Sequence, residues 1–72
     1  RAEAELAEQA AVAAQVRDLV TASGLGMAEF ASRIGTSRSR LSTYRSGRVT
    51  PSATLMLRMQ RVSSDTASAR HE

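Results

Sequence analysis

Three glycines and one proline divide this 72-residue chain into four stretches that favour helix. Gly24, Gly35 and Gly47 each follow a helix-forming segment, and glycine readily adopts the left-handed conformation that ends a helix. Pro51 follows Thr50, and this pair predicts an N-cap followed by a first-turn proline. The sequence therefore predicts an all-α arrangement without strands or repeats. Its helices are expected at residues 2–22, 27–33, 37–46 (capped by Thr36 or Ser37) and about 50–62.

Apolar residues show which parts of these helices pack. In the first helix the apolar stripe is weak before Val12 and firm after it. We therefore expect residues 1–9 to form an N-terminal helical extension and residues 10–62 to form one domain. Residues 63–72 are serine, threonine, alanine and charged residues with nothing to bury, which predicts a disordered tail.

Composition excludes most kinds of chemistry. The chain has no cysteine and a single histidine, His71, which is next to last. It therefore lacks a thiolate and has almost no material for a metal site or an imidazole base. No apolar run approaches the ~20 residues that a membrane-spanning helix needs, and no hydrophobic signal segment is present. We expect a cytoplasmic binding domain rather than an enzyme, with no cofactor, no metal and no membrane partner.

The charges are distributed very unevenly. Residues 1–20 contain two arginines and four acids, whereas residues 33–61 contain seven arginines and no acid. Such a block is typical of a surface that binds a polyanion, although a solvated arginine-rich face would give the same pattern. A membrane surface fits less well, because glycines and a proline interrupt the basic stretch and no continuous amphipathic helix results.

The third helix separates into two faces when its residues are placed about 100° apart. Leu41 and Tyr44 fall on the side expected to be buried. Short hydroxyl side chains and one arginine fall on the opposite side: Arg38, Ser39, Ser42, Thr43 and Ser46. Arg40 and Arg45 fall on the two flanks. A helix in a major groove would thus have small polar readers in its middle and cations toward the phosphates on each side.

Residues 25–52, LGMAEFASRIGTSRSRLSTYRSGRVTPS, resemble the phage repressor/Cro-type (XRE) helix-turn-helix family. The resemblance covers about residues 16–62, with the family's marks at Phe30, Ala31, Gly35, Leu41, Tyr44, Gly47 and Pro51. It implies a four-helix, lambda-repressor-like domain that binds duplex DNA, commonly as a homodimer on a symmetric site. By position, Arg38, Ser39 and Thr43 would face base edges, joined by Ser42 on the same face. Phosphates would be held by Ser37, Ser46 and Arg48, with Arg40 and Arg45 on the flanks.

Three positions depart from the family pattern. A glutamine that contacts phosphate usually begins the second helix, and here Met27 occupies its place. The family often pairs a first-helix arginine with a glutamate, but these positions are Val20 and Arg45. Arg45 is then available for phosphate or for Glu29. Residues 63–72 offer no fifth helix for a dimer interface, so the extended first helix is the leading surface for self-association.

Two functions from different classes fit these features. The first is a sequence-specific duplex-DNA-binding regulator, expected to be a repressor, from a bacterial or phage gene of high GC content. The alternative is a protein-interaction or antitoxin-like adaptor module that uses the N-terminal helix. Single-stranded nucleic acid fits poorly, because Phe30 and Tyr44 are the only aromatic residues and both are assigned to the core.

Overall fold

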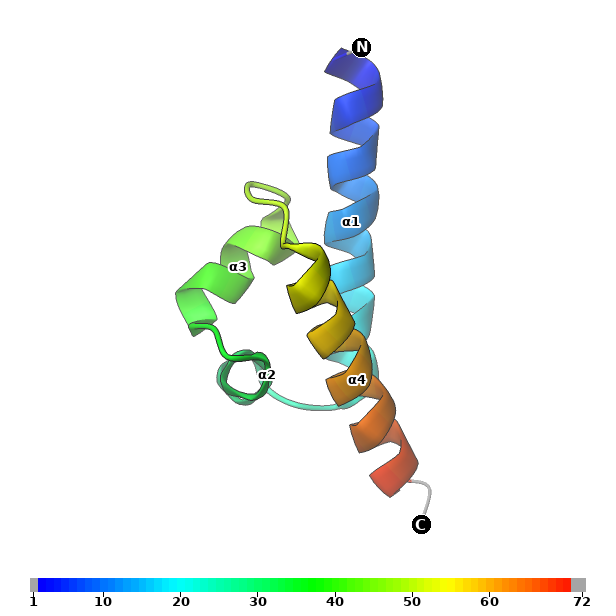
Figure 1. Cartoon of the computed structure of the whole chain (residues 1–72), viewed down its shortest axis with the longest axis vertical. Coiled ribbons are helices and arrows are strands. Elements are labelled where there is room, and N and C mark those ends of the chain that lie inside the picture. The colour runs from blue at the N-terminus through cyan, green and yellow to red at the C-terminus, as the bar shows by residue number, and fades with distance from the viewer. Residues whose placement is uncertain (1, 71–72) are drawn as a thin grey trace.

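The computed structural model describes residues 2–70, with side chains described for residues 7–66. It contains the helices α1 (Ala2–Ser23), α2 (Met27–Ile34), α3 (Arg38–Ser46) and α4 (Ala53–Arg70). No strand occurs between residues 2 and 70, which confirms the predicted all-α class. In Figure 1, α1 and α4 pack against each other, and α2 and α3 lie on one side of this pair.

All four helices contribute to one hydrophobic core. Phe30 and Leu41 are completely buried, and so is Met59 of α4. Each such side chain stabilises the fold by about 1.5–3 kcal/mol relative to its exposed state. The remaining buried apolar residues come from α1, α2 and α3: Ala13, Val16, Val20, Ala31, Ile34 and Tyr44. The side of α2 and the side of α3 that were predicted to face the core are therefore confirmed.

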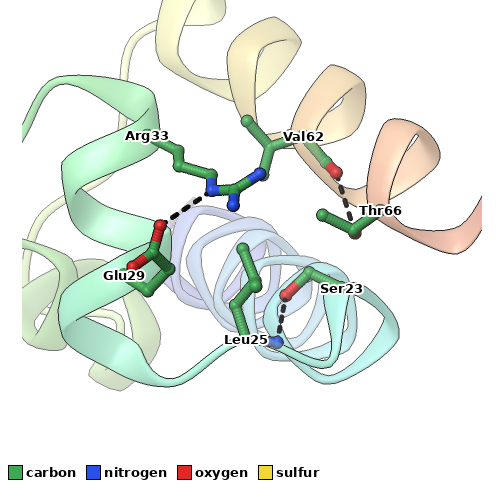
Figure 2. A network of polar contacts seen from close by, with 6 residues as sticks. All are labelled: Ser23, Leu25, Glu29, Arg33, Val62 and Thr66. Carbon is green, nitrogen blue, oxygen red and sulfur yellow. Dashed lines mark hydrogen bonds and ion pairs between the residues drawn. The ribbon is translucent and has the colours of Figure 1, made fainter. Parts of the chain in front are cut away.

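The end of α1 is fixed by a buried serine. Ser23 Oγ donates to the Val20 carbonyl at 2.6 Å and accepts from the Leu25 amide at 3.1 Å. Figure 2 shows the second of these bonds. Gly24 follows with φ of 71°, the left-handed conformation expected for it. The chain thereby leaves α1 without an unpaired amide at Leu25.

The start of α4 differs from the prediction. Helix α4 begins at Ala53, and Ser52 is its cap, since Ser52 Oγ accepts from the Leu55 amide at 3.1 Å. Pro51 is buried ahead of the helix and is not its first-turn residue. The prediction was wrong because both Thr50 and Ser52 can cap a helix, and the proline favoured the earlier one.

The predicted disordered tail is also wrong for residues 63–70, because α4 continues to Arg70. Ser63 is only 5% exposed, so a small polar residue extends the packed face where no large apolar residue is present. Thr66 Oγ1 donates to the carbonyls of Val62 and Ser63 at 2.9 and 3.1 Å, and the first bond is drawn in Figure 2. Residues 71 and 72, including His71, lie outside the described residues.

Helix α1 continues beyond the packed body. Its described side chains from residue 7 to residue 11 are exposed, Val12 is half-buried, and Ala13 is the first buried residue. The N-terminal turns of α1 project past α3 and α4 in Figure 1. On the body side, a Cβ placed on Gly47 would lie 3.5 Å from Ala13 Cβ, so the loop after α3 packs closely on α1.

Candidate nucleic-acid interface

Helices α2 and α3 are joined by a turn of three residues. Gly35 adopts φ of 82°, and its amide donates to the Ser32 carbonyl at 3.1 Å. Ser37 then caps α3, with its Oγ accepting from the Arg40 amide at 3.1 Å. Ala31 is 1% exposed in the hydrophobic core, where a larger side chain would overpack it. The spacing predicted for a helix-turn-helix is thus present.

The turn leaves one face of α3 directed away from the core. Arg38, Ser39 and Ser42 are exposed and Thr43 is half-buried, so these four predicted base-reading residues share the outer face. A shallow open depression, here called the α3 groove, runs along them. It is lined by Met27, Arg38, Ser39, Ser42, Thr43, Arg45 and Arg48.

The residues predicted to contact phosphate are more dispersed. Arg45 and Arg48 line the α3 groove, whereas Ser46 lines a second depression that adjoins it. Ser37 and Arg40 are exposed at the N-terminal part of α3 and line neither depression. The arginines predicted to contact phosphate are thus distributed around the four outer-face residues, which are Arg38, Ser39, Ser42 and Thr43.

Arg45 is held more tightly than its flank position suggests. Its Nη1 donates to Met27 Sδ at 3.3 Å, and its Nε is buried without a hydrogen-bond partner among the described residues. Glu29, considered above as its alternative partner, instead forms an ion pair with Arg33 at 2.9 Å (Figure 2). The guanidinium of Arg45 therefore lies beside the start of α2, next to Met27.

The comparisons with known proteins agree with this geometry. Residues 11–63 match a family model described as "Helix-turn-helix domain". The chain belongs to this helix-turn-helix family. No curated protein and no solved structure matches it. The match confirms the resemblance to a helix-turn-helix DNA-binding domain, and such a domain indicates a DNA-binding regulator.

Two arginines that the sequence revealed only as charges fix the helices of this helix-turn-helix domain. Arg17 Nη1 of α1 donates to the Arg45 carbonyl at 2.8 Å. Arg58 Nη1 of α4 donates to the Ile34 carbonyl at 3.3 Å. Both acceptors belong to the last turn of a helix, where carbonyls lack intrahelical partners. No motif in the sequence marks these two contacts. The sequence shows only that Arg17 lies in the first helix and Arg58 in the fourth.

Neither a metal-ligand cluster nor a membrane-spanning helix is present in the described part of this helix-turn-helix protein. Among these residues no three histidine, cysteine, aspartate or glutamate side chains are grouped as a metal site would require. No described helix is both long enough and apolar enough to cross a bilayer.

Proposed function

We propose that this domain binds double-stranded DNA sequence-specifically, with α3 in the major groove. The observation that carries the proposal is the outer face of α3. It presents Arg38 and three short hydroxyl side chains, while Leu41 and Tyr44 anchor the opposite side in the core. No acid occurs between residues 33 and 61 to repel phosphate. Solvent faces of ordinary helices usually mix both signs of charge.

The dimensions of α3 suit this role. An α-helix with its side chains is about 10–12 Å across, and the major groove is about 12 Å wide and 8.5 Å deep. Short side chains in the middle of the outer face let the helix backbone approach the base edges. The longer side chains of Arg40 and Arg45, on the two flanks of the helix, lie toward the sugar–phosphate strands.

Roles follow from the donor patterns of these side chains. Arg38 is exposed on the first turn of α3, and a guanidinium can donate to both O6 and N7 of guanine. Ser39, Ser42 and Thr43 read neighbouring base edges. Five residues contact phosphate in this proposal: Ser37, Arg40, Arg45, Ser46 and Arg48. The domain acts as a transcriptional repressor by occupying its site, and a homodimer would bind two half-sites.

The test is fluorescence anisotropy against duplex DNA over a range of salt concentrations. Each neutralised phosphate adds about 0.9 to the slope of log affinity against log salt. We expect Arg48→Ala to reduce this slope by about one contact and to weaken all sequences alike, whereas Arg38→Ala relaxes selectivity at one base pair. Arg61→Ala is the matched control, because it removes the same charge from α4 outside the α3 groove. A wild-type slope near zero refutes the proposal.

A second function, binding of a protein partner through α1, is favoured by the projecting turns of that helix. Side chains 7–11 are exposed on a helix that is continuous with the core. Deleting residues 1–9 should abolish partner binding or self-association while leaving the affinity for a single DNA half-site intact. Loss of half-site affinity in that variant would count against a separate role for this segment.

A further inference from the structure

The hydroxyl of Thr43 differs from a freely rotating hydroxyl, because its hydrogen already forms a bond within α3. Thr43 Oγ1 donates to the Arg40 carbonyl at 2.6 Å, a short bond within α3. A hydroxyl has one hydrogen and two acceptor lone pairs. With the hydrogen directed back at its own helix, Thr43 can offer only lone pairs to a ligand in the groove.

The position of Thr43 is also fixed by its own backbone. Its carbonyl accepts from the amides of Arg48 and Val49 at 3.1 and 3.3 Å, and from Ser46 Oγ at 3.1 Å. The side chain lies half-buried between the α3 groove and the adjoining depression, and it lines both. A side chain held in this way presents hydrogen-bond acceptors to every DNA duplex that contacts the outer face of α3.

The geometry points to Thr43 as an acceptor-only specificity residue, which selects amino bases over keto bases where it meets the duplex. In the major groove adenine and cytosine present amino donors, whereas guanine and thymine present carbonyl acceptors. Lone pairs of Thr43 attract the amino group and repel the carbonyl oxygens. Thr43 therefore prefers adenine over guanine at a purine, or cytosine over thymine at a pyrimidine. This inference rests on the proposed binding of duplex DNA.

Arg38 has the opposite character, because a guanidinium has only donors. The two residues are five positions apart, about 7.5 Å along the helix axis, whereas base pairs are about 3.4 Å apart. They consequently reach different base pairs. The preferred site should combine a guanine selected by Arg38 with a separate amino base selected by Thr43.

The experiment is selection of bound duplexes from a randomised library, followed by sequencing, for wild type and single variants. Thr43→Val removes the lone pairs but keeps the branched shape, and Thr43→Ser keeps the hydroxyl. We expect an amino-base preference of about fivefold in wild type, which corresponds to about 1 kcal/mol. Thr43→Val should lose it at that position alone, Thr43→Ser should retain it, and Arg38→Ala should affect another position. Circular dichroism checks that each variant is folded.

The outcomes separate this inference from the proposed function. A wild-type motif that is unchanged in Thr43→Val overturns the role of Thr43, while sequence-specific binding stands. A guanine or thymine preference at the position that Thr43→Val alters also overturns it. Absence of any enriched motif or of salt-dependent duplex binding in wild type refutes the proposed function as well.

Discussion

Replacing Gly47 with alanine should destabilise the domain through the backbone alone. Gly47 has φ of 84°, where an L-residue with a Cβ is strained by about 1–2 kcal/mol. The added Cβ would lie 3.5 Å from Ala13 Cβ and 3.9 Å from the Gln9 carbonyl oxygen, which are ordinary contacts. Steric overlap therefore contributes nothing. Alanine also restricts the unfolded chain, which offsets about 0.4–1 kcal/mol of the strain.

The net loss is about 1 kcal/mol, which lowers Tm by about 4–8 °C for a domain of this size. The assay is thermal unfolding followed by far-ultraviolet circular dichroism, supported by urea unfolding to obtain the free energy. Gly47→Asn should lose less than Gly47→Ala, because asparagine tolerates the left-handed conformation better than other side chains.

Gly26→Ala is the matched control. Gly26 has φ of −71°, and a Cβ there would meet nothing within 4 Å. The restricted unfolded chain and the poorer N-cap act in opposite directions, so the free energy of unfolding should change by less than about 0.5 kcal/mol. Equal stability of wild type and Gly47→Ala, or equal losses at both glycines, would refute the conformational explanation.

Three further substitutions test contacts at the start of α2, at the end of α3 and at the end of α1. Met27→Gln should raise DNA affinity about fivefold in anisotropy titrations, because a neutral donor replaces the thioether and adds about 1 kcal/mol; unchanged affinity would show that position 27 does not reach phosphate. Arg17→Ala should weaken DNA binding several-fold in the same titrations, since it releases the Arg45 carbonyl, and Arg17→Gln, which removes the charge but keeps an N–H donor, should weaken it less; equal losses in the two variants would assign the effect to charge. Ser23→Ala should lower the free energy of unfolding by about 1–2 kcal/mol in urea, because the Leu25 amide loses its acceptor; a loss below 0.5 kcal/mol would contradict this reasoning.

The sequence predicted those features that depend on local conformation or on periodicity. Gly35 and Gly47 end α2 and α3 because few other residues adopt their positive φ. Leu41 and Tyr44 are three positions apart, so one turn of helix buries both. The ends of α3 and its buried side together determine which residues form its outer face.

Features that depend on main-chain acceptors or on small buried residues were not predictable in this way. The Arg17 bond ends on a carbonyl, and every residue has one, so nothing in the side-chain pattern marks Arg45 as the partner. The lack of large apolar residues after Val62 predicted a disordered tail that included Ser63. Its burial depends on how closely neighbouring helices approach, which is a tertiary property.

Helix α1 also provides a mechanical link between two ends of the molecule. Its 22 residues form a rod of about 33 Å, and Arg17 joins its packed half to the last turn of α3. Anything that binds the projecting half is therefore carried on the same continuous helix that contacts the Arg45 carbonyl at the end of α3.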